Sequence, residues 1–104
     1  KEKIIKIFCD KNNSRIVLFG MSALATTIVN FLPNKLRDKI VLLCDNDKEK
    51  HGKILCGYNK KITHPKSILK IDYDKLIICS YFFKKEIIQS ISPYIKTKQK
   101  IILL

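Results

Sequence analysis

Residues 16–19 read Ile-Val-Leu-Phe, an uninterrupted apolar run that ends at Gly20. A strand with one face in water alternates apolar and polar side chains, whereas a continuous run of β-branched and aromatic residues is typical of a strand covered on both faces. Two further apolar runs of this kind occupy residues 40–44 and 76–79. Strands covered on both faces belong mainly to parallel sheets with helices above and below them. The three runs therefore restrict the chain to the α/β class.

Segments with helical signals separate the three runs. Ser22 is a favoured N-cap residue, and Pro33 stops the helix that Ser22 begins. Isoleucines recur at helical spacing from residue 87 to residue 95, where Pro93 bends or shortens the helix. The sequence predicts helices at 2–9, 22–32, 65–69 and 84–95, strands at 15–19, 39–44, 62–64, 75–79 and 100–104, and loops at 34–38 and 45–61, the second with an extended piece at 54–55.

Strands that alternate with helices predict a parallel sheet with right-handed crossovers. The expected order places the 39–44 strand at one edge, followed by the strands at 15–19, 75–79 and 100–104. We therefore predict a single domain over residues 1–104, a three-layer Rossmann-like α/β domain with a parallel sheet of about four main strands. This order puts a topological switch point, the usual ligand site, beside the end of the first strand. Because the chain starts without Met and stops on Ile-Ile-Leu-Leu, we expect it to be a piece of a longer polypeptide.

The apolar runs are too short for a membrane span, which needs about 20 residues, and the amino end shows no signal-peptide pattern. The four cysteines, at positions 9, 44, 56 and 79, include no CxxC pair. Cys44 and Cys79 each close an apolar run, which predicts buried thiols in a cytoplasmic protein. A zinc site from Cys44, His51, Cys56 and His64 would have a spacing that fits no compact ligand pattern, so no metal is expected.

The formal net charge of +12 raises the question of nucleic-acid binding. The basic residues are almost all lysines spread along the chain, and only Arg15 and Arg37 are arginines. Specific nucleic-acid sites tend to use arginine forks and exposed aromatic side chains. We therefore do not expect a nucleic-acid partner. The charge would still raise the affinity for a small phosphate-bearing ligand.

The turn after the first strand carries the most informative motif. A dinucleotide-binding fingerprint reads G-x-G-x-x-G/A at this place, and the chain has Gly20, Ser22 and Ala25 at the three positions. Ser22 can offer its hydroxyl and amide to one phosphate at the amino end of a helix, or it can act as an N-cap alone. The candidate phosphate-binding residues are Gly20, Met21, Ser22 and Ala23.

Polar and aromatic residues follow the second and third strands. Asp45 lies where a Rossmann domain places the acid that binds a ribose hydroxyl, with Asn46 beside it; the alternative is a turn former in Asp-Asn-Asp. Ser80, Tyr81 and Phe82 would line the same crevice, where the two aromatic rings stack on a ligand or serve as half-buried packing.

The two histidines of the chain, His51 and His64, have no carboxylate or serine partner at a motif spacing. No catalytic triad or acid–base pair is therefore recognisable, and the catalytic residues stay unknown. The absence of such a pair predicts a domain that does not catalyse a reaction by itself.

The order of motifs from Arg15 onward is similar to that of a known group of domains. These motifs are Ile16-Val17-Leu18-Phe19-Gly20, Val41-Leu42-Leu43-Cys44-Asp45-Asn46-Asp47, then Lys50, Gly52, Lys53 and Gly57, then Ile62, Pro65, Ile68 and Leu69, and finally Leu76-Ile77-Ile78-Cys79 before Glu86-Ile87-Ile88. The chain resembles the small Rossmann-like domains attached to bacterial surface-sugar enzymes. Examples are the amino-terminal part of sugar acetyltransferases, the CoA-binding-like domain of polysaccharide-biosynthesis dehydratases, and the carboxyl-terminal domain of sugar C-methyltransferases.

The resemblance implies a cytoplasmic accessory domain that binds a nucleotide or nucleotide sugar, with NAD(P) or a nucleotide sugar as its cofactor or ligand. It implies a parent enzyme that is a sugar-modifying transferase or a dehydratase or epimerase of surface-glycan biosynthesis. The partners would be the other domains of that enzyme and a second copy in a homo-oligomer. The alternative is a non-catalytic structural or assembly module whose Rossmann crevice is empty.

Overall fold

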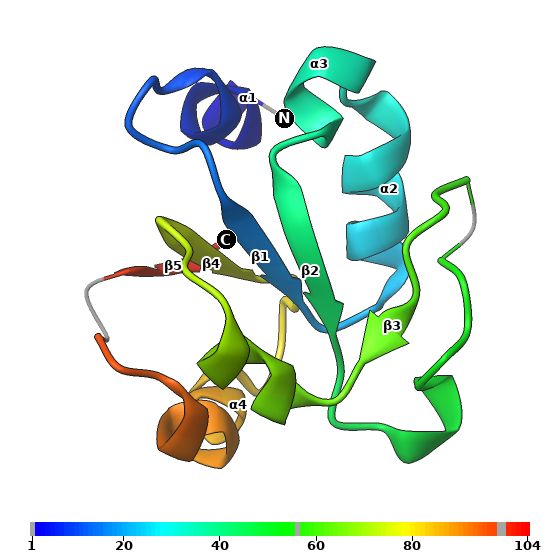
Figure 1. The fold of residues 1–104 in the computed structure, drawn as a ribbon, viewed down its shortest axis with the longest axis vertical. Coiled ribbons are helices and arrows are strands. Elements are labelled where there is room, and N and C mark those ends of the chain that lie inside the picture. The colour runs from blue at the N-terminus through cyan, green and yellow to red at the C-terminus, as the bar shows by residue number, and fades with distance from the viewer. Residues whose placement is uncertain (1, 56, 98–99) are drawn as a thin grey trace.

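A computed structural model describes residues 2–55, 57–97 and 100–104 of the chain (Figure 1). Helices and strands alternate along most of it. The α-helices are α1 (Glu2–Cys9), α2 (Ala23–Phe31), α3 (Asn34–Arg37) and α4 (Lys84–Ile91). The strands are β1 (Ile16–Phe19), β2 (Ile40–Cys44), β3 (Ile62–Thr63), β4 (Lys75–Ile78) and β5 (Ile101–Leu103). Short 3₁₀ helices are η1 (Lys48–Lys50), η2 (Pro65–Lys70) and η3 (Ser92–Tyr94).

The strands of the described ranges form one parallel sheet in the order β3-β2-β1-β4-β5. This is the order of a Rossmann sheet, and β1 lies between β2 and β4, where the direction of the connections reverses. The predicted α/β Rossmann-like fold is therefore confirmed. The prediction that the 39–44 strand forms an edge is wrong, because Ile62 and Thr63 pair with Leu43 and Cys44 on its outer side.

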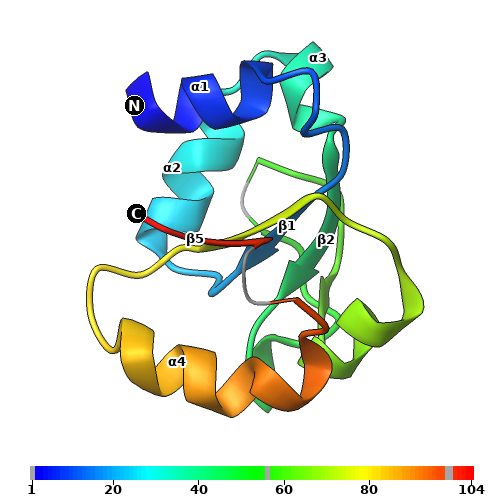
Figure 2. The ribbon, with the colours of Figure 1, turned by 90° about the vertical axis from the view of Figure 1, so that its left-hand side faces the viewer.

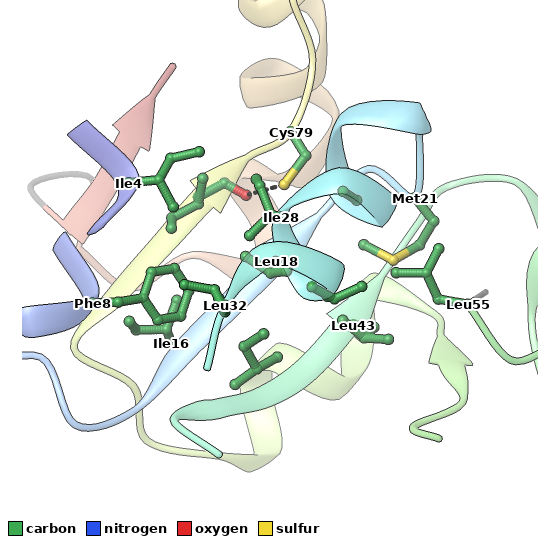
Figure 3. Packing of buried hydrophobic residues seen from close by; sticks show 14 of the residues in the cluster. Ile4, Phe8, Ile16, Leu18, Met21, Ile28, Leu32, Leu43, Leu55 and Cys79 are labelled. Atoms are coloured by element: carbon green, nitrogen blue, oxygen red, sulfur yellow. Dashed lines mark hydrogen bonds between the residues drawn. The ribbon is translucent and has the colours of Figure 1, made fainter. Parts of the chain in front are cut away.

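Each face of the sheet packs against its own layer of helices (Figure 2). Ile16 and Leu18 of β1 join a buried cluster with side chains of α1 and α2, and Figure 3 shows this cluster. Val17 and Phe19 point to the other face and join a cluster with side chains of η2 and α4. The alternation along β1, with all four residues buried, explains why this strand is apolar throughout.

The predicted helix boundaries hold for most elements. Ser22 caps α2, and Pro33 follows the end of this helix. The predicted end of the last helix at residue 95 is wrong, because α4 stops at Ile91 and Pro93 belongs to the separate turn η3. The loop predicted at 34–38 is wrong, because α3 forms a single helical turn there. Leu36 packs this turn against the core cluster. This contact is with residues distant in sequence, so the pattern of the four local residues does not indicate it.

The predicted 45–61 loop also contains local structure. Asp47 caps η1 through a hydrogen bond from the Glu49 backbone N–H (3.0 Å), and Ile54 forms a single antiparallel bridge with Lys61. None of the helices in the described ranges has the length and apolar character that a bilayer crossing requires.

Candidate functional site

The carboxyl ends of β1, β2 and β4 meet at the switch point of the sheet, and the turn at Gly20 lies between β1 and α2. Gly20 has a φ of +92°, a left-handed conformation that glycine adopts without a side-chain penalty. A Cβ atom built on Gly20 would meet the Cys79 carbonyl oxygen at 3.5 Å, an ordinary contact. The backbone conformation, and not crowding, is therefore what favours glycine at this turn.

Ser22 joins the turn to both α2 and β4. Its Oγ atom accepts hydrogen bonds from the N–H groups of Leu24 (3.2 Å) and Ala25 (3.4 Å). The same hydroxyl donates to the carbonyl oxygen of Cys79 at 2.7 Å. The interpretation of Ser22 as an N-cap is confirmed, and its single hydroxyl hydrogen is already committed to the β4 end.

Most backbone N–H groups of this turn are committed in the same way. The Met21 N–H donates to Asp45 Oδ2 (2.8 Å), and the Ser22 N–H donates to the Gly20 carbonyl (3.0 Å). The N–H groups of Leu24 and Ala25 donate to Ser22 Oγ. Four of the five N–H groups from residue 21 to residue 25 therefore have an acceptor in the described structure. The N–H of Ala23 is the exception. A phosphate at this turn would find one ready donor and not a cradle of several.

Asp45 is held in one orientation by its neighbours. Its Oδ2 atom accepts from the Met21 N–H and lies 3.5 Å from Lys50 Nζ, while Oδ1 accepts from the Asp47 N–H at 2.8 Å. Lys50 Nζ also donates to the Met21 carbonyl at 3.2 Å. The Asp45 side chain is 14% exposed. A carboxylate has about four accepting positions, so Asp45 keeps accepting capacity after these contacts.

The structure brings together two histidines that the sequence left unconnected. His51 Nε2 lies 2.7 Å from the Asp45 carbonyl oxygen, and the His51 and His64 rings meet edge-on with centroids 5.4 Å apart. His64 Nδ1 accepts from the Lys66 N–H (3.0 Å), and its ring packs against Tyr94. Loss of hydration first, and then electrostatic interactions with His51, Lys66 and Lys48, lower the pKa of His64. These contacts brace the β2 and β3 ends, and no sequence spacing signals them.

Asn46 and Ser80 secure two other loops at this edge. Asn46 Nδ2 donates to Ser90 Oγ (2.9 Å), which ties the β2 end to α4. Ser80 Oγ donates to the Phe82 carbonyl oxygen and accepts from the Phe82 N–H (3.2 Å), which closes a tight turn.

Tyr81 and Phe82 project from this turn, with exposed fractions of 67% and 72%. The interpretation of these two aromatic residues as half-buried packing is therefore wrong, because the tight turn at Ser80 carries the chain away from the core. Tyr81 lines a hollow of about 270 Å³ together with Leu24, Thr27 and Phe31. Of the predicted site residues, Gly20, Met21, Ser22 and Asp45 form one connected group, whereas Tyr81 belongs to this separate hollow.

The cysteine environments follow from burial. Cys9 is exposed, whereas Cys44 and Cys79 are buried free thiols, as predicted for residues that close strands. Burial raises the pKa of Cys44 to about 11 and that of Cys79 to about 12. Cys56, the remaining member of the conceivable zinc set, lies outside the described residues. Within those ranges, no three His, Cys, Asp or Glu side chains are close enough to hold a metal ion.

We expect a thiol reagent at pH 8 to modify Cys9 in the folded chain and to spare Cys44 and Cys79. Thiolate is the reactive form. Because pH 8 is far below the raised pKa values of Cys44 and Cys79, both buried thiols stay protonated. Mass mapping of peptides after iodoacetamide treatment reads the three sites separately. Unfolding in urea should make all three react, and equal labelling before unfolding would contradict the burial of Cys44 and Cys79.

Comparison with protein families gives one result. A family model described as "C2185-like, N-terminal" matches residues 12–102, which includes every strand of the sheet except the last residue of β5. No curated protein matches the chain.

Proposed function

The chain belongs to the C2185-like N-terminal family, and we propose that within it this domain is an accessory module that binds a nucleotide or nucleotide sugar. The observation that carries the proposal is the fixed carboxylate of Asp45 at the switch point of the sheet. This is the position from which Rossmann domains bind a ribose hydroxyl.

The geometry around Asp45 supports a hydroxyl-bearing ligand. The Met21 N–H and Lys50 hold the carboxylate in place from one side, and the Asp47 N–H holds it from the other. A ligand hydroxyl that donates to Asp45 would therefore not need to order the side chain first. Preorganisation of this kind lowers the entropic cost of binding.

The turn at Gly20 supports a single phosphate better than a pyrophosphate. It offers the Ala23 N–H, the amino end of α2 and the charge of Lys50, whose side chain is 41% exposed. The net charge of +12 adds long-range attraction for a phosphate. We place the ligand phosphate at Gly20–Ala23 and the sugar hydroxyls at Asp45. The rest of the ligand, predicted near Ser80–Phe82, stays a prediction.

In this proposal the domain is part of a larger cytoplasmic enzyme of surface-glycan biosynthesis. Another domain of that enzyme carries out catalysis. The free thiols of Cys9, Cys44 and Cys79 support a reducing compartment. His51 and His64 are engaged with backbone groups and face no carboxylate in the described structure, which supports a binding role over acid–base catalysis.

A second candidate function is a structural or assembly module with an empty crevice. It is favoured by the four committed N–H groups of the Gly20 turn and by the committed hydroxyl of Ser22. A turn whose donors are satisfied within the chain is stable without a ligand.

Titration calorimetry of the chain with UDP-glucose, NAD⁺ and NADP⁺ separates the two functions. We expect one of these probes to bind, and Asp45→Asn to weaken that binding about tenfold through the loss of a charge-assisted hydrogen bond. Asp47→Asn is the matched control, because it removes the same charge two residues away and should leave the affinity within about twofold. Both variants are measured at a temperature where circular dichroism shows them folded. Failure of all three probes to bind would overturn the nucleotide proposal and favour the assembly module.

A further inference from the structure

Large apolar side chains are exposed mainly on one side of the molecule. Six such residues have an exposed fraction of 40% or more in the described ranges, and four of them are Tyr81, Phe82, Phe83 and Leu103. Figure 2 shows the β4–α4 loop, the end of β5 and the start of α1 along the same side. Tyr81 and Leu104 line a common hollow with residues of α1 and α2, which confirms that these segments are neighbours. A contiguous exposed apolar patch usually marks an interaction surface.

The loop that carries three of these residues also has a strained backbone. Phe83 has a φ of +59°, the left-handed region that bulky side chains rarely adopt. It precedes α4 without a side-chain cap hydrogen bond. Consecutive Tyr81, Phe82 and Phe83 side chains are all more than 65% exposed. We call these three residues the aromatic tip. A strained backbone that holds apolar side chains in solvent is typical of a segment that binds a partner.

Three lysines lie near the aromatic tip, in sequence or in space. Lys84 and Lys85 follow it directly, and Lys3 lines the hollow beside Tyr81. Lys84 Nζ donates to the Leu104 carbonyl, and Lys3 Nζ donates to the Leu103 carbonyl at 3.0 Å, so both ammonium groups lie beside these two leucines. The acidic residues nearby in sequence are Glu2 and Glu86, and the chain as a whole carries a net charge of +12. The partner of this side should therefore carry negative charge.

We propose that the aromatic tip attaches the domain to the surface of an anionic lipid bilayer. Aromatic side chains favour the interface between headgroups and acyl chains, and lysines near an anionic leaflet add attraction. The tip is a projecting turn, which a bilayer accepts without a matching pocket. The phosphate and ribose contacts proposed at Gly20–Ala23 and Asp45 lie outside the aromatic tip.

Co-sedimentation of the chain with lipid vesicles tests the proposal. The first vesicles contain phosphatidylcholine and phosphatidylglycerol, and the second contain phosphatidylcholine alone. We expect binding to the anionic vesicles that decreases at high salt. The variant Tyr81→Ser, Phe82→Ser, Phe83→Gly should weaken it about tenfold or more. Glycine suits the left-handed position, so this variant should keep its fold.

The matched control changes apolar residues that are exposed elsewhere. Ile54 and Leu69, with exposed fractions of 60% and 46%, lie in other segments, so Ile54→Ser with Leu69→Ser should bind the anionic vesicles like the unchanged chain. Equal binding by the tip variant and this control would overturn the proposal. Equal binding to both vesicle types would overturn it too, as would sedimentation of the chain without vesicles, which would assign the patch to self-association.

Discussion

Replacing Phe8 with alanine should lower the free energy of unfolding by about 3–5 kcal/mol. The Phe8 side chain has no exposed surface and packs from α1 into the cluster around Ile16 and Leu32 (Figure 3). Alanine would leave a cavity that the parallel sheet beneath cannot fill by relaxing. Globular domains have a total stability of about 5–15 kcal/mol, so this loss is a substantial share of the whole.

Urea unfolding followed by circular dichroism measures this change. The thermal midpoint should also fall by at least about 12 °C, because each kcal/mol shifts it by about 4–8 °C in a domain of 60–100 residues. Phe82→Ala is the matched control: Phe82 is 72% exposed, so the same substitution should change stability by less than about 0.5 kcal/mol. Similar losses in the two variants would show that α1 does not pack as described.

The second large effect is expected at Asp45. Asp45→Asn should lower the free energy of unfolding by about 2–3 kcal/mol. An amide has only one oxygen, so it cannot accept from both the Met21 and the Asp47 N–H groups, and its NH₂ group would face one of these donors. The ion pair with Lys50 is lost as well. Because Met21 is buried, an unpaired N–H there lacks water as a substitute partner.

Chemical denaturation of Asp45→Asn and Asp47→Asn gives the comparison. Asp47 accepts the Glu49 N–H as the cap of η1, and asparagine caps a helix as well as aspartate does. We therefore expect a change of at most about 0.5 kcal/mol for Asp47→Asn. Equal stability of the two variants would mean that the carboxylate of Asp45 does not hold the Gly20 turn.

Local patterns along the chain predict most of this fold. The apolar run at 16–19 predicts a strand buried on both faces, and the structure buries all four of its residues. Ser22 and Pro33 bound α2 because capping and chain-stopping depend on residues adjacent in sequence. Gly20 marks the turn for the same reason, since its left-handed conformation is a property of one residue.

Features that depend on contacts between distant residues are not visible in the sequence. The edge position of β3 depends on two residues pairing with β2, and α3 depends on Leu36 reaching the core. Within the site, the place of Asp45 directly after a strand predicts its role, but its contact with Met21 depends on the fold. Lys50, His51 and His64 join the site through a loop whose path no periodicity describes.

The central place of β1 has a consequence for the order of synthesis on the ribosome. Ile16 pairs with Ile40 on one side and with Lys75 on the other, and Lys75 is translated much later. Until β4 leaves the exit tunnel, the nascent chain presents one open, wholly apolar edge of β1, the kind of edge that recruits another strand. A fragment that ends before residue 75 should therefore aggregate or engage a chaperone, and the smallest independently folding piece must extend through β4.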